Sequence, residues 1–144
     1  MREILFKGKS AVTGEWVEGY FYYPIISGNN IPCIIPCEEL AKTLVNSKIY
    51  QIDPETVCQY TGLTDNNGKK IFEGEVVLTD DMYNREVRYP GVKYCVRMRE
   101  GSWIAESSSK KWRFLAVAVR HGLEVIGNIF DNPDLLTTSS TDSD

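Results

Sequence analysis

The sequence is poor in histidine and lacks the long apolar runs and glycine-rich loops that mark several large classes of protein. Its 144 residues include one histidine, His121, so the usual base for nucleophilic catalysis has a single candidate. Neither G-x-G-x-x-G nor G-x4-G-K-S/T occurs, which excludes the two common phosphate-binding loops. No run approaches the roughly 20 apolar residues of a membrane span, and residues 1–8 lack the apolar stretch of a secretion signal. We therefore expect a cytoplasmic protein without membrane contact.

Cysteines are present, but not in the pattern of a metal site. Cys33 and Cys37 have a spacing found in zinc sites, whereas Cys58 and Cys95 do not form the second pair that such sites need. We therefore expect four reduced and mostly buried thiols, no metal and no cofactor. A nucleophilic pair of Cys58 or Cys95 with His121 stays open as an alternative, although no nucleophile motif flanks either cysteine.

Acidic residues offer a second candidate chemistry. Glu73, Glu75, Asp80 and Asp81 could together hold Mg²⁺ for phosphoryl transfer. Alternation along a strand puts Glu73 and Glu75 on one face but separates the adjacent Asp80 and Asp81. We interpret these acids as solvated strand ends and predict that the protein is not an enzyme.

The composition, 42% hydrophobic and 25% charged, is that of an ordinary globular protein, and its local pattern is mainly β. Glu38–Val45 is the only segment with helical spacing, because its apolar residues recur at 40, 41, 44 and 45. Runs rich in β-branched and aromatic residues, separated by turn residues, predict short strands elsewhere. These lie at 2–6 and 16–23, which form a hairpin, and at 56–60, 75–79, 92–99, 103–106, 114–119 and 124–130, while the prolines in 31–36 allow only an edge strand or an extended loop.

The expected fold is all-β with at most one short helix. A change in pattern near residue 53 divides the chain into a β-rich N-terminal region, 1–53, and a region 54–136 with five or six short strands. Short strands at this density favour a small barrel or sandwich, because closure removes exposed strand edges. The tail, 137–144, is polar, acidic and without aromatics, so we expect it to be disordered.

Three segments carry a family resemblance. Residues 53–77 (DPETVCQYTGLTDNNGKKIFEGEVV), 124–136 (EVIGNIFDNPDLL) and 2–6 (REILF) resemble, in this order, the signature of the YopX family of phage and prophage proteins. Cys58 and Glu75 depart from it, where the family has a small residue and an aspartate. The resemblance implies an SH3-like β-barrel at 54–136 and a self-associating protein of the host bacterial cytoplasm, but it implies no activity. We expect the signature to be structural, and its main residues are Asp53, Gln59, Tyr60, Thr61, Gly62, Asp65, Gly68, Gly74, Gly127 and Asn128.

Charge is distributed unevenly along the predicted barrel. The whole chain carries −4 with an isoelectric point near 5.1, which argues against indiscriminate coating of nucleic acid. Residues 85–120 nevertheless hold nine basic and three acidic residues, a net +6, whereas residues 53–84 hold two basic and seven acidic, a net −5.

Two functions follow from this asymmetry. The first is a non-catalytic accessory protein that forms a homo-oligomer, or binds a phage or host protein, through complementary charged faces. The alternative is nucleic-acid binding by the basic segment 85–120, whose interleaved rings could stack on bases. In both cases the candidate binding residues are Arg97, Arg99, Trp103, Lys110, Lys111, Trp112 and Arg113.

Overall fold

The computed structural model describes residues 3–37, 48–79 and 91–137. The chain divides into two compact units, Met1–Tyr60 and Thr61–Asp144, and the division falls within strand β7 (Cys58–Thr64). Our sequence-based boundary lies after residue 53, ahead of this division. The predicted helix at 38–45 and nearly all of the predicted disordered tail lie outside the described residues.

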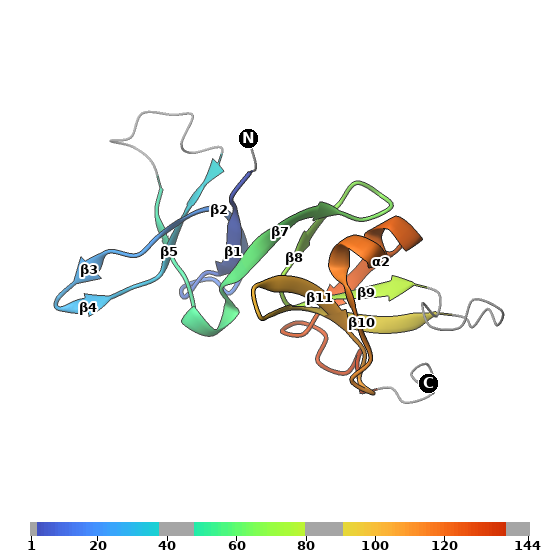
Figure 1. Cartoon of the computed structure of the whole chain (residues 1–144). Helices are drawn as coiled ribbons and strands as arrows, with labels where there is room; N and C mark the ends of the chain where they lie inside the picture. The colour runs from blue at the N-terminus through green and yellow to red at the C-terminus, as the bar shows by residue number, and fades with distance from the viewer. Residues whose placement is uncertain (1–2, 38–47, 80–90, 138–144) are drawn as a thin grey trace. The chain divides into compact units, whose positions relative to one another are not determined.

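The first unit is an antiparallel sheet with the order β6-β5-β2-β1 followed by the first residues of β7 (Figure 1). A short 3-10 helix leads into β7. The elements are β1 (Phe6–Lys9), β2 (Trp16–Tyr22), β3 (Ile25–Ile26), β4 (Asn29–Asn30), β5 (Cys33–Pro36), β6 (Tyr50–Gln51) and η2 (Pro54–Thr56). In the chain, β3 and β4 come between β2 and β5. They form a separate two-stranded hairpin, which extends away from those strands as an arm in Figure 1.

The predicted hairpin is confirmed, but its first arm was placed wrongly. The arm is β1 rather than residues 2–6, and it pairs with β2 from Phe6 opposite Gly19 to Lys9 opposite Trp16. The turn fixes this register, because the Ser10 hydroxyl accepts the N–H groups of Val12 and Thr13 at 3.2 Å each.

The expectation for 31–36 was also wrong in part. β5 is not an edge strand, because it pairs with β2 on one side and with β6 on the other. The prolines permit this arrangement because Pro32 precedes the strand, and Pro36 lies beyond the two residues, Cys33 and Ile34, that pair with β6.

The second unit is built on a five-stranded antiparallel sheet of order β12-β11-β10-β9-β13. Its elements are the end of β7, β8 (Lys70–Phe72), β9 (Glu75–Thr79), β10 (Val92–Arg99), β11 (Ser102–Glu106), β12 (Trp112–Phe114), helix α2 (Leu115–His121) and β13 (Glu124–Asn128). A mainly β fold with one short helix is thus confirmed for the described residues. Within them the sheet is open, ending at β12 and β13, so no closed barrel is found.

The strand predicted at 114–119 is wrong, because the chain forms helix α2 there. The run Leu115-Ala116-Val117-Ala118-Val119 alternates large and small apolar residues, which resembles a strand. In the helix, Leu115 and Ala118 are fully buried on one face, while Val117 is exposed on another. Packing of this face on β11 and β12 therefore outweighs the β propensity of the valines.

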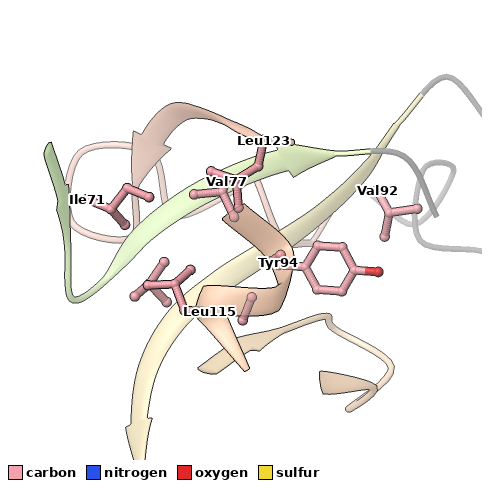
Figure 2. Packing of buried hydrophobic residues seen from close by; sticks show 9 residues of the cluster. Ile71, Val77, Val92, Tyr94, Leu115 and Leu123 are labelled. Atoms are coloured by element: carbon pink, nitrogen blue, oxygen red, sulfur yellow. The ribbon is translucent and has the colours of Figure 1, made fainter. Parts of the chain in front are cut away.

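The core of the second unit lies where α2 meets the sheet. Figure 2 shows side chains from β8, β9, β10 and α2 gathered in one cluster, with Tyr94, Val77 and Leu115 fully buried. Val96 and Ala105 of β10 and β11 belong to the same cluster. Because side chains alternate along a strand, the residues between these positions lie on the opposite face of the sheet.

Candidate functional site

The face of β10 and β11 opposite the core carries two arginines. Arg97 and Arg99 are two residues apart on β10, so their side chains leave the same face. Arg97 lies opposite Ile104 of β11, and Glu106 of β11 continues that face. Ile104 is 2% exposed, which gives the charged residues an apolar floor.

A single carboxylate lies between the two arginines. Glu106 Oε1 is 3.5 Å from Arg97 Nε, and Glu106 Oε2 is 3.9 Å from Arg99 Nη1. The arginine side chains are about half exposed, at 49% and 53%, whereas the Glu106 side chain is only 15% exposed. Ion pairs this exposed contribute little stability, at most about 1 kcal/mol each, but they orient both guanidinium groups toward one place.

Trp112 adds an aromatic surface beside these charges. It lies directly opposite Glu106 in the β11–β12 pairing, and the Arg99 guanidinium lies over its ring, 5.6 Å from the centroid. The ring of Phe114, two residues further along β12, packs edge-on against Trp112 at 5.3 Å. Trp112 stays 36% exposed and Phe114 50% exposed, so both rings remain open to a ligand.

A tight turn brings Lys110 to the same place. The turn between β11 and β12 is closed by hydrogen bonds from Ser107 N to Lys111 O, 2.8 Å, and from Lys110 N to Ser107 O, 3.0 Å. Lys110 has φ of 70°, in the left-handed region that few non-glycine residues adopt. This backbone conformation is part of how the turn places a third cation beside the arginines.

These residues line one open hollow of about 490 Å³. Its lining is Arg97, Met98, Arg99, Ile104, Glu106, Lys110 and Trp112. Three cations and one carboxylate leave the hollow with a net charge of +2, next to an exposed indole. The arrangement suits an anion that also presents a flat or apolar group.

The structure brings together only part of the predicted binding set. Arg97, Arg99, Lys110 and Trp112 line the hollow, whereas Lys111 is not among its lining residues. Trp103 and Arg113 lie on the other face of the sheet, in register with Met98 and Ala105, and Trp103 packs against the core. Glu106 and Ile104 were missed, although strand alternation would have placed them on the arginine face once the hairpin register was known.

Among the described residues of the second unit, the acids of the segment 53–84 do not form an exposed face. Among its described carboxylates in the second unit, Asp65 and Glu75 are buried, at 8% and 3% exposure. Glu75 Oε1 accepts the Phe72 N–H at 2.7 Å. Glu73 is half-buried, and Asp80 and Asp81 lie outside the described residues. The net charge of −5 read from the sequence is therefore not a net charge at the described surface.

Asp65 holds a turn to a distant strand. Its Oδ1 accepts the N–H groups of Asn67 and Lys69 at 2.8 and 2.9 Å, and its Oδ2 accepts the Val125 N–H of β13 at 2.9 Å. Burial acts to raise the pKa of Asp65, but the hydrogen bonds from Val125, Lys69 and Asn67 outweigh it, and the pKa lies below its usual value.

The other signature residues also make local backbone contacts. Asp53 accepts the Glu55 N–H at 3.1 Å and caps η2, and Gln59 and Tyr60 belong to β7. Thr61 Oγ1 donates to the Ile71 carbonyl at 2.8 Å. Gly62, Gly68 and Gly74 have positive φ angles of 87°, 77° and 81°.

The closing motif is a compact hydrogen-bonded turn. Asn128 Oδ1 accepts the N–H groups of Phe130 and Asp131 at 3.0 and 2.8 Å. A Cβ on Gly127 would lie 2.5 Å from Asn132 Oδ1 and 2.8 Å from Leu135 Cδ1, so a larger residue would displace these side chains. All these contacts fix the path of the backbone.

Of the candidates for thiol and metal chemistry, Cys95 lies directly opposite Glu106 in the β10–β11 pairing but is not among the residues that line the hollow. The four cysteines all fall in the described part of the chain, and none forms a disulfide. Burial raises the pKa of Cys33 and, against the nearby Arg97 charge, that of Cys95, so both thiols are poor nucleophiles at neutral pH. Across residues 3–37, 48–79 and 91–137, no three His, Cys, Asp or Glu side chains are grouped as a metal would require. None of the helices described is long and apolar enough to cross a membrane.

The fold and the hollow define a mainly β protein of two units, with a basic and aromatic surface on the second. The family model described as YopX protein matches residues 6–137, and the chain belongs to the YopX family. Its fold is similar to that in the crystal structure of protein EF1440 from Enterococcus faecalis, with a TM-score of 0.56 and 23% identity over 94% of this chain and 99% of that one. No match was found among curated proteins.

Proposed function

We propose that the protein is a non-catalytic binding module that holds single-stranded nucleic acid in the hollow of its second unit. The observation that supports this most directly is the placement of Arg97, Arg99 and Lys110 around the exposed ring of Trp112. Cations that line one hollow can bind backbone phosphates, and an exposed indole stacks on bases, which contributes about 1–3 kcal/mol per base.

Nucleic acid is favoured over an acidic face of a second copy for two reasons. Asp65 and Glu75, two acids of the segment 53–84 in the second unit, are buried in hydrogen bonds and so are not available to pair with the hollow of a second copy. A base also offers a flat ring that can stack on the exposed part of Trp112, which an acidic protein surface does not.

The fold of the second unit supports a binding role. Four strands, β9 to β12, follow one another in a meander, and after α2 the fifth strand, β13, returns to pair with β9. This connectivity supports an SH3-like arrangement, which we propose for the second unit. From its family, we also propose that the protein is a phage or prophage accessory protein of the host bacterial cytoplasm. The hollow lies on the β10–β11–β12 part of that sheet.

Substitutions in the hollow test the proposal. We expect the unaltered chain to bind a fluorescent single-stranded 12-mer at low salt, with an affinity that falls as salt rises. Trp112→Ala should weaken binding about 10-fold through lost stacking. Arg99→Glu should weaken it at least as much and reduce the salt dependence. Fluorescence anisotropy over a salt series measures both.

The control variant is Arg120→Glu, which makes the same charge change at an exposed cation of α2 outside the hollow. It should leave the affinity within about twofold, because a charge far from the ligand is screened. Poly-glutamate serves as a second anion without rings. If poly-glutamate binds as well as the oligonucleotide, the ligand is an acidic peptide and the proposal fails. It also fails if Trp112→Ala has no effect, because the ring then does not stack on bases.

A second candidate function, self-association, has its own observation in the first unit. Large apolar and aromatic side chains are exposed from Tyr20 in β2 to Ile26 in β3. Ile25 and Ile26 are 71% and 49% exposed. β3 pairs only with β4 among the described strands, so its other edge can pair with the same edge of a second copy. We propose this arm as the contact in a homo-oligomer; a phage or host protein is the other occupant to consider.

Removing the two isoleucines tests the arm. Ile25→Ser with Ile26→Ser should convert the oligomer to a monomer, because both side chains would leave the interface. Light scattering after size exclusion gives the mass at several protein concentrations. Val12→Ser, at an 87% exposed apolar residue outside the arm, is the control and should keep the oligomer. A chain that is already monomeric at high micromolar concentration would rule out this contact.

A further inference from the structure

The hollow contains one group that a simple anion-binding site would not need. Glu106 lines the hollow between Arg97 and Arg99, and its negative charge opposes the binding of phosphate. An ionised carboxylate is an acceptor only, so it can bind a ligand only where the ligand presents N–H or O–H donors. Its position therefore carries information about which part of a ligand lies there.

Glu106 and Trp112 are direct cross-strand neighbours on the same face. The Cβ atoms of such neighbours lie about 5 Å apart, so a base stacked on the indole would have its edge within reach of the carboxylate. The guanidinium of Arg99 lies over the Trp112 ring and beside Glu106, so it is near enough to pair with a phosphate of the same nucleotide. Ring, acceptor and cation are thus arranged as a pocket for one nucleotide.

On the basis of the proposed function, we infer that Glu106 reads the edge of the base stacked on Trp112 and makes the hollow select cytosine over uracil or thymine. Cytosine presents its N4 amino group as a donor, which a carboxylate accepts. Uracil and thymine present the O4 carbonyl at the same position, and a carboxylate beside it would be repelled. Because cytosine, uracil and thymine have the same ring size, stacking on Trp112 contributes little to the difference.

The matched ligands for the test are the single-stranded RNA 12-mers oligo-C and oligo-U, with an abasic 12-mer as a probe of backbone contacts alone. We expect oligo-C to bind the unaltered chain about fivefold or more tightly than oligo-U. Glu106→Gln should bring that ratio close to one, because the amide can donate to O4 as well as accept from N4. Its affinity for the abasic strand should rise slightly, since a negative charge is removed.

The control variant is Glu100→Gln, at an exposed carboxylate in the β10–β11 turn that does not line the hollow, and it should keep the preference for oligo-C. If Glu106 only positioned the arginines, Glu106→Gln would weaken all three strands equally and leave the ratio unchanged, which would overturn the inference. Equal binding of oligo-C and oligo-U to the unaltered chain would overturn it too, while leaving the proposed function intact. If none of the three strands binds, the proposed function falls and the inference with it. Thermal unfolding of each variant confirms that it is folded, and Glu106→Ala, which also removes the acceptor, replaces Glu106→Gln if that variant is not.

Discussion

Asp65→Ala should lower the free energy of unfolding by about 3 kcal/mol. The substitution removes the acceptor of three backbone N–H groups, those of Asn67, Lys69 and Val125. Because the site is 8% exposed, water replaces these hydrogen bonds poorly. Urea unfolding followed by circular dichroism measures the change, and the midpoint of thermal unfolding should fall by about 10 °C.

Glu124→Ala is the control for this loss, since Glu124 is an exposed carboxylate next to Val125 and the change should cost less than about 0.5 kcal/mol. The pH dependence identifies the mechanism. The pKa of Asp65 is lowered from 3.8 in the folded protein, so its contribution is complete above the unfolded value and is lost as pH falls through the folded one. Stability below about pH 4 should therefore fall more steeply in the unaltered chain than in Asp65→Ala. Equal slopes would show that the carboxylate is not the group that titrates.

Gly19→Ala should destabilise the first unit by about 3 kcal/mol or more. Gly19 lies in β2 between Phe6 of β1 and Pro36 of β5. A Cβ at this position would overlap the Ile35 carbonyl oxygen and lie 2.8 Å from Pro36 Cα, both of them backbone atoms. The strands would have to separate, because no side chain can move aside. Hydrogen exchange of the β2 and β5 amides measures the loss by residue.

Gly28→Ala makes the same chemical change where nothing lies within 4 Å of the new Cβ. Gly28 has φ of 83°, so this control should cost about 1 kcal/mol from backbone strain alone. The difference between the two variants isolates the close approach of the strands. Similar losses in both would contradict the packing argument.

The sequence alone determined the class of the fold and the position of most strands. The runs at 75–79, 92–99 and 103–106 agree with β9, β10 and β11, because their alternating apolar residues reflect which face is buried. Turn residues were equally informative where glycine adopts positive φ, as at Gly68 and Gly101. The family signature was readable too, and it led to the family that the chain belongs to.

The local pattern failed where a distant partner decides the outcome. Residues 115–121 carry β-type residues but form α2, because the helix buries Leu115 and Ala118 against β11. The acids of the segment 53–84 appeared to form a charged face, yet Asp65 is used 60 residues away at Val125. No short-range pattern contains such a contact.

The candidate site shows the same division. Composition and spacing determined that cations and rings are concentrated in the segment 85–120 of this protein. Only the tertiary structure decided which of them act together, since strand register places Arg97, Arg99 and Trp112 on one face and Trp103 and Arg113 on the other. The physical reason is that alternation within one strand decides which of its own side chains share a face. Which side chains of other strands lie beside them depends on the register of pairing between separate segments of the chain.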